Sequence, residues 1–130
     1  MPTRPLSPHL SVYKFKYTMV TSILNRFAGA ALSAGLLLLV YWLSAVAGGE
    51  RSQVRAGRIL SLPVVKLIYL GLIIAFSYHL IAGVRHLIWD TGRGLERNQA
   101  RRSAWVVAAA SLALALVIVY CAWFGAAHPR

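Results

Sequence analysis

Two histidines in a long apolar stretch are the residues of this chain best suited to chemistry. Residues 76–86 read FSYHLIAGVRH and contain His79 and His86. In an α-helix, His79, Gly83 and His86 lie on one face, with the histidines about 10 Å apart along the axis, whereas Arg85 points elsewhere. An imidazole nitrogen in apolar surroundings can bind haem iron, and a glycine lets a flat porphyrin approach the backbone. The pattern is therefore compatible with a haem whose iron is bound by His79 and whose propionates lie at the level of His86.

A structural role for the same histidines stays open. His79 could equally hydrogen-bond a neighbouring helix, and His86 could be a residue of the membrane interface. Two histidines on one face of one helix cannot take opposite axial positions on one iron, and His9 and His128 lie outside the long apolar stretches. If two histidines bind the haem, the second must come from another polypeptide.

A second polar cluster begins another apolar stretch, at residues 22–29 (SILNRFAG). Ser22, Arg26, Gly29 and Ser33 form a narrow stripe of small and polar residues on one helix face. The Arg26 guanidinium could bind a haem propionate, a quinone carbonyl or both, with Ser22 beside it. Alternatively, Arg26 extends to lipid phosphates, and the small residues only permit close helix packing.

Three stretches without formal charge supply the helices that carry these clusters. They are 23, 18 and 27 residues long and cover residues 27–49, 67–84 and 103–129. A helix needs about 20 residues to cross a hydrocarbon layer of about 30 Å. The sequence therefore predicts an all-α membrane protein with one membrane-anchor domain over residues 1–130. Its expected transmembrane helices cover residues 22–47, 63–88 and 104–125, and the connections between them are short.

Composition excludes several other classes of protein. Hydrophobic residues make up 58% of the chain and charged residues only 13%, which is not typical of a soluble domain. The net charge is +11, but the basic residues lie between the apolar stretches, as in a membrane protein with basic loops and not a nucleic-acid-binding protein. The single cysteine, Cys121, excludes an internal disulfide, a thiolate iron–sulfur site and a structural zinc site.

The basic residues also predict an orientation in the membrane. Nine lie on the side of the N-terminus and the second connection, and five lie on the other side. Because basic loops stay in the cytoplasm, we expect a short cytoplasmic N-terminal segment and an external C-terminus. The chain begins at Met1 without an Arg- and Ser-rich leader, so we expect a complete bacterial protein of the cytoplasmic (inner) membrane.

Three motifs in series resemble one family. They are residues 4–14 (RPLSPHLSVYK), residues 22–29 (SILNRFAG) and residues 78–90 (YHLIAGVRHLIWD). In this order and spacing, over residues 4 to about 95, they resemble the cytochrome b subunit of succinate dehydrogenase, which is the larger of the two small membrane anchors of respiratory complex II.

The resemblance implies a three-helix anchor that works with a second small anchor, an iron–sulfur subunit and a flavoprotein subunit. FAD and the iron–sulfur clusters would belong to the partner subunits, where succinate is oxidised, and ubiquinone would be reduced near the membrane surface. By motif position, His79 would be an axial ligand of one haem b shared with the second anchor. His86 and Arg26 would lie near the propionates, and Ser22 with Arg26 would contribute to the quinone pocket.

One position departs from the family pattern. The family commonly has a histidine directly before the arginine of the second motif, whereas this chain has Asn25. Asparagine can hydrogen-bond but cannot titrate near neutral pH, so a role in proton delivery at this position is in doubt.

A membrane anchor of the same complex that holds no haem is the alternative function.

Overall fold

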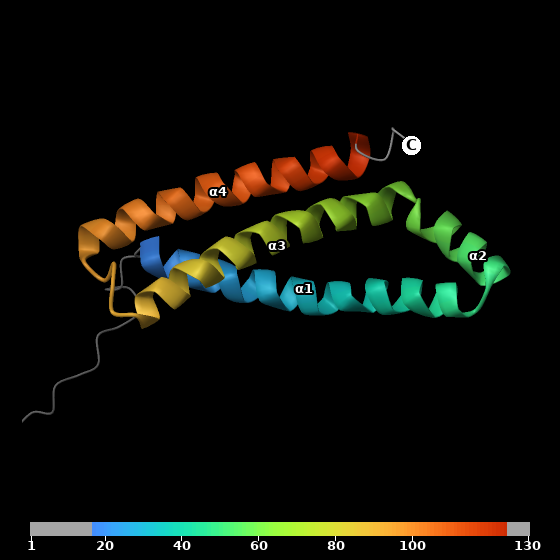
Figure 1. Cartoon of the computed structure of the whole chain (residues 1–130), viewed down its shortest axis with the longest axis horizontal. Coiled ribbons are helices and arrows are strands. Elements are labelled where there is room, and N and C mark those ends of the chain that lie inside the picture. Colours follow the sequence, from blue (N-terminus) through green and yellow to red (C-terminus); the bar gives the residue numbers. More distant parts are fainter. Residues whose placement is uncertain (1–16, 125–130) are drawn as a thin grey trace, which may run out of the picture.

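Helices account for nearly all of the chain that the structure describes. The computed structural model describes residues 17–124, so the first motif, His9 and His128 lie outside the described residues. The four helices are α1 (Tyr17–Ala47), α2 (Glu50–Leu60), α3 (Pro63–Asp90) and α4 (Arg97–Phe124). Figure 1 shows α1, α3 and α4 running side by side and α2 closing one end of the bundle. The predicted all-α fold is confirmed.

Three of these helices are long and apolar enough to cross a membrane. The candidate spans are Met19–Ala47, Pro63–Asp90 and Asn98–Phe124. They overlap the predicted spans, but α4 begins at Arg97, seven residues before the predicted start at 104. The polar first turns of α4 contain Gln and Arg, which favour helix as strongly as most apolar residues do. Hydropathy therefore located the membrane-crossing part of α4 but not the helix end.

The first connection contains a helix that the sequence analysis did not predict. α2 is an 11-residue helix, and it follows a sharp turn at Gly49, whose φ of 86° lies in the left-handed region that favours glycine. Pro63 then occupies the first turn of α3, where its missing N–H costs no hydrogen bond. These two residues set the bounds of α2 and allow the chain to reverse direction between α1 and α3.

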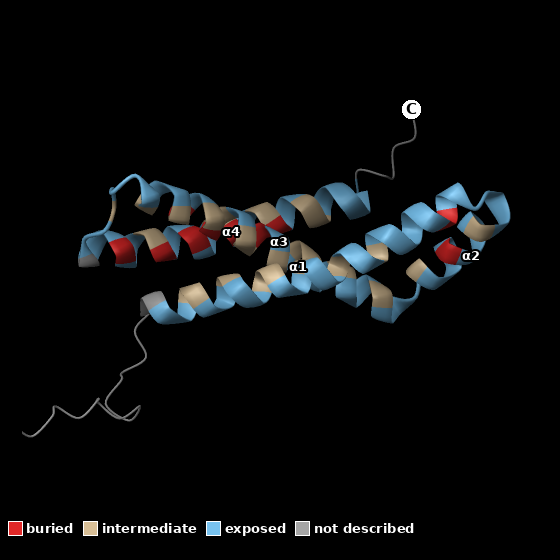
Figure 2. Ribbon diagram, turned by 90° about the horizontal axis from the view of Figure 1, so that it is seen from below, coloured by how far each residue is buried: buried red, intermediate tan, exposed pale blue. Residues whose placement is uncertain are grey.

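The buried positions lie mainly where α3 and α4 face each other (Figure 2). Most of them are small, which lets two helix backbones approach closely without a large apolar core. They are Ser77, Ala82, Arg85, Ala100, Ala104, Val107, Ser111 and Ala115. Large apolar side chains such as Leu37 and Phe27 are instead 72% and 67% exposed, as expected for surfaces that meet lipid or other membrane helices.

Because α1 and α3 run in opposite directions, the polar clusters at residues 22–29 and 76–86 lie toward the same end of the bundle. The N-terminal half of α1, the C-terminal end of α3 and the start of α4 meet at one end in Figure 1. Arg26 and His86 therefore lie toward the same membrane surface, as the sequence predicted. α2 lies at the opposite end.

Candidate functional site

The His79 ring is held by the backbone of α1. Its Nδ1 lies 3.1 Å from the main-chain oxygen of Asn25. A carbonyl oxygen can only accept a hydrogen bond, so Nδ1 must carry the proton and donate it. The lone pair of the neutral imidazole is then on Nε2. This is the arrangement that metal-binding histidines commonly use, with one nitrogen fixed by a carbonyl and the other directed to the metal.

A glycine of α1 makes room for this ring. A Cβ atom at Gly29 would lie only 3.0 Å from Cε1 of His79 and 3.5 Å from Nδ1. Carbon atoms pack best at about 3.5–4.0 Å, so any larger residue at position 29 would push the imidazole away. Sequence reasoning placed Gly29 in a stripe of small residues but missed its contact with His79. It also missed the Asn25 carbonyl, because every residue has such a group and the sequence gives no signal for it.

A second hydrogen bond fixes the same part of α3 against α1. The Tyr78 hydroxyl donates to the main-chain oxygen of Thr21 at 3.0 Å. Thr21 and Asn25 lie one helical turn apart, and they pair with the adjacent residues Tyr78 and His79. The two bonds set the register between α1 and α3 at the level of the candidate ligand.

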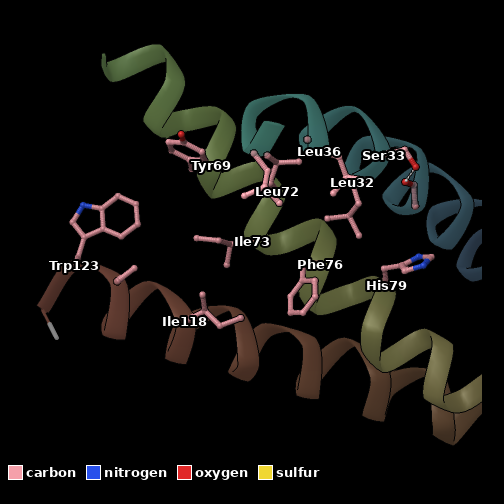
Figure 3. Close-up of a pocket in the computed structure, with 14 residues that line it drawn as sticks. Leu32, Ser33, Leu36, Tyr69, Leu72, Ile73, Phe76, His79, Ile118 and Trp123 are labelled. Atoms are coloured by element: carbon pink, nitrogen blue, oxygen red, sulfur yellow. Dashed lines mark hydrogen bonds between the residues drawn. The ribbon is translucent and has the colours of Figure 1, made fainter. Parts of the chain in front are cut away.

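An apolar hollow of about 770 Å³ opens beside His79. Figure 3 shows His79 toward one end of it and Trp123 at the other, with side chains from α1, α3 and α4 along its walls. The apolar side chains between these ends include Leu32, Leu36, Leu72, Ile73, Phe76 and Ile118. Pockets for small molecules and cofactors commonly have about 300–1,000 Å³ and apolar walls with few polar groups. This hollow has both properties.

The predicted quinone residues occupy the α1 turns next to His79. Ser22 is half-buried and Arg26 is exposed, and each directly follows a residue whose carbonyl binds α3. The Arg26 guanidinium has no hydrogen bond or ion pair with any residue in the described range. The side-chain oxygen Oδ1 of Asn25 is buried and has no hydrogen-bond partner among residues 17–124. A buried acceptor of this kind is costly without a donor, so it marks a place where a donor from outside these residues would fit.

Arg85 and His86, although adjacent, have different surroundings. Arg85 is 6% exposed and faces α4, where Nε donates to Oγ of Ser103 at 3.0 Å and Nη2 to the Ala100 carbonyl at 2.9 Å. Its guanidinium carbon also lies 4.0 Å from the centre of the Trp89 ring, a cation–π contact. His86 is half-buried and meets Trp89 edge to face, with ring centres 5.3 Å apart. Arg85 therefore packs the bundle, and His86 keeps ring nitrogens for other partners.

The glycine between the two histidines borders open space. No described atom lies within 4 Å of the position that a Cβ at Gly83 would take. Within the described range, no three side chains of His, Cys, Asp or Glu come together as a metal site. A cofactor that brings its own metal needs only one or two protein ligands, so the lack of such a cluster does not bear on haem binding.

The family model described as the succinate dehydrogenase/fumarate reductase transmembrane subunit matches residues 1–118. The chain belongs to this family. The identification made from the three sequence motifs is therefore confirmed, and the chain is a membrane-anchor subunit of an oxidoreductase complex.

Individual relatives agree with this assignment. The chain is 40% identical over 114 residues to the succinate dehydrogenase cytochrome b556 subunit of Paracoccus denitrificans, covering 88% of each chain. It is 31% identical over 115 residues to the cytochrome b556 subunit of Rickettsia felis, covering 88% of this chain and 90% of the relative. The chain is also 39% identical over 107 residues to the mitochondrial cytochrome b560 subunit of Sus scrofa, covering 80% of this chain and 63% of that longer protein.

Proposed function

We propose that this chain is the haem-carrying anchor of a bacterial succinate:quinone oxidoreductase. His79 would bind the iron of a single haem b, and a residue of the second anchor subunit would provide the other protein ligand. Succinate is oxidised in the flavoprotein subunit, and electrons reach ubiquinone through the iron–sulfur subunit. The observation that carries this proposal is the bond from His79 Nδ1 to the Asn25 carbonyl, which leaves Nε2 as the metal-binding nitrogen.

The residues present fit a haem group. The His79 imidazole and the apolar hollow beside it suit a flat, largely apolar ring, and open space lies beside Gly83, which does not itself line the hollow. The propionates need donors or positive charge. Arg26 lies in the N-terminal half of α1 and His86 near the C-terminal end of α3, and these two segments meet at the same end of the bundle. When bound, haem would supply a one-electron redox group at this level of the membrane. This chain contributes the ligand, its orientation and the surroundings that exclude water.

The quinone site that we propose uses Ser22 and Arg26. A serine hydroxyl and a guanidinium can both donate to a quinone carbonyl, and the positive charge of Arg26 stabilises negative charge that develops on that oxygen during reduction. The exposure of Arg26 and its lack of partners among residues 17–124 support this role. Asn25 can hydrogen-bond at this site but cannot hold a transferable proton near neutral pH.

The proposed orientation puts this site at the cytoplasmic surface, with the C-terminus outside. The excess of basic residues at the Arg26 end supports it. In this orientation the soluble partner subunits meet the membrane on the same side as Ser22, Arg26 and His86.

The haem assignment is tested by the spectrum of the purified complex. His79→Ala removes the ligand, so the b-type band in the reduced-minus-oxidised absorbance spectrum should weaken or vanish relative to flavin content. Leu80→Ala is the matched control, because Leu80 is 44% exposed and does not border the hollow, and its spectrum should match the wild type. An unchanged band in His79→Ala would refute His79 as the ligand.

The quinone assignment is tested by two assays on the same preparation. Ser22→Ala and Arg26→Leu should slow quinone reduction by succinate about 10-fold or more, because transition-state donors are lost. Succinate oxidation with an artificial soluble acceptor should continue at the wild-type rate. Ser44→Ala is the control, since the Ser44 hydroxyl donates only to the Val40 carbonyl of α1 itself, near the opposite end of the bundle. Loss of both activities would contradict the assignment and show a role in assembly instead.

A purely structural anchor is the second candidate. The contact of His79 with Asn25 would also stabilise two packed helices without any cofactor. Haem stoichiometry separates the two functions. A complex with all subunits, full quinone reductase activity and no haem would favour the structural anchor.

A further inference from the structure

A strongly charged surface of the described chain lies on α2, at the opposite end of the bundle from Arg26 and His86. Arg51, Arg55 and Arg58 are exposed on this 11-residue helix. At about 100° per residue they fall within about 60° of one another, so the three guanidinium groups share one face. None of the three groups makes a hydrogen bond or ion pair with another residue of the described range. Glu50 is the only acidic residue beside them, so the face is strongly positive.

The side of α2 turned away from these arginines packs on the bundle. Ala56 is 1% exposed, and by the same helical arithmetic it lies on the far side of α2 from the arginine face. Apolar Val54 and Ile59 flank the arginines and are 51% and 43% exposed. A basic face bordered by apolar side chains is typical of a helix that lies at a membrane surface.

The length of α1 fixes the depth of α2. Arg26 lies near one membrane surface, and α1 continues for 21 residues from there to Ala47. At about 1.5 Å per residue this is about 32 Å, which matches a hydrocarbon layer of about 30 Å. α2 begins three residues after α1 ends, so it lies at the level of the lipid headgroups on the opposite surface.

We propose that Arg51, Arg55 and Arg58 form a docking surface for the phosphate groups of anionic phospholipids. A shallow hollow of about 430 Å³ is lined by these three arginines together with Glu50 and Val54. Arginine is suited to phosphate because its planar fork donates two parallel hydrogen bonds. The surface depends on the fold and membrane depth only, and it is independent of haem or quinone binding.

Lipid crosslinking in the assembled complex tests this surface. The complex is reconstituted in nanodiscs that carry a photoactivatable headgroup analogue of either phosphatidylglycerol or neutral phosphatidylcholine, and label on the peptide of residues 50–60 is measured by mass spectrometry. One arginine near an anionic membrane surface strengthens binding roughly five-fold. We therefore expect at least about ten-fold more label from phosphatidylglycerol in the wild type.

Variants of the same three residues provide matched controls. The triple variant Arg51→Gln, Arg55→Gln, Arg58→Gln should label equally with both lipids, whereas the triple Arg→Lys variant should keep most of the preference. If the triple Gln variant does not assemble, the three single Arg→Gln variants should each reduce the preference several-fold. Equal labelling of the wild type would overturn the proposal. Loss of labelling in excess inorganic phosphate at constant ionic strength would indicate a site for free anions and would also overturn it. Crosslinking of a protein subunit in place of lipid would do the same.

Discussion

At the scale of single residues, the orientation of the His79 ring depends on two backbone features of α1 and not on any side chain of that helix. The Asn25 carbonyl selects the tautomer, and the missing Cβ of Gly29 lets the ring reach that carbonyl. Sequence alone singled out His79 as the candidate ligand, because it lies within an apolar stretch. It could not predict the contacts that orient the ring, since these depend on how two distant segments pack.

Gly29→Ala should disturb the haem while leaving the succinate-oxidising subunits intact. The added methyl would lie 3.0 Å from Cε1 of His79, so the ring must shift and its bond to Asn25 must weaken. Loss of an outer partner of a metal-binding histidine commonly lowers metal affinity about 10–100-fold. We expect lower haem occupancy per flavin and a changed reduction potential, measured by redox titration of the b-type band.

Gly71→Ala is the control for this change. Apart from the local backbone of α3, no described atom lies within 4 Å of the position of its Cβ, so the added methyl group would contact no side chain and no other helix. Equal haem properties in Gly29→Ala and the wild type would show that position 29 does not seat the histidine.

At the scale of elements, α3 and α4 meet along a seam of small residues with one buried cation. Arg85 is satisfied there by Ser103 and by the Ala100 carbonyl, and the Ser103 hydroxyl itself donates to the same carbonyl. The sequence indicated that Arg85 points away from the histidine face, and the structure agrees. The sequence gave no sign that α4 would supply the hydrogen-bond partners of Arg85, because Ala100 and Ser103 lie in the polar first turns of α4, outside the predicted span.

Two identical substitutions on α4 should have different effects on stability. Ser103→Ala leaves Nε of the buried Arg85 without its acceptor, which should destabilise the subunit by about 1–3 kcal/mol. Ser111→Ala removes a buried hydroxyl that has no partner among the described residues, so stability should stay within about 0.5 kcal/mol of the wild type or rise. Both are measured by denaturant-induced dissociation of the purified complex. A larger loss in Ser111→Ala than in Ser103→Ala would contradict the hydrogen bonding described here.

Prediction of the elements was accurate where hydropathy decides and incomplete elsewhere. Charge-free runs located all three membrane-crossing helices, because lipid requires long apolar segments with internal hydrogen bonds. α2 was missed because its 11 residues contain four charged side chains and no long apolar run, and a surface helix this short depends on packing against its neighbours, here through Ala56.

At the scale of the whole molecule, the three long helices share a common arrangement of charge. The uncharged stretches of α1, α3 and α4 lie side by side along the bundle, and the charged residues lie toward its two ends. Large apolar side chains remain exposed over much of α1. This surface agrees with a subunit that is covered by lipid and by other subunits in the complete complex.

Cysteine labelling from one side of the membrane tests the proposed orientation. In a Cys121→Ala background, Gln53→Cys places a thiol on exposed α2, and Asn98→Cys places one at the exposed start of α4. A membrane-impermeant maleimide added to intact spheroplasts should label Cys at position 53 and spare Cys at position 98. After lysis both should react. The opposite pattern would reverse the orientation inferred from the basic residues.

The most direct measurement of the central claim is chemical replacement of the His79 imidazole. In a His79→Gly complex, the reduced-minus-oxidised spectrum should lose the b-type band, and added free imidazole should restore it by entering the space of the missing ring and binding the iron. Restoration would show that this imidazole is an iron ligand. A band that survives the substitution at full intensity in the absence of imidazole would contradict the account.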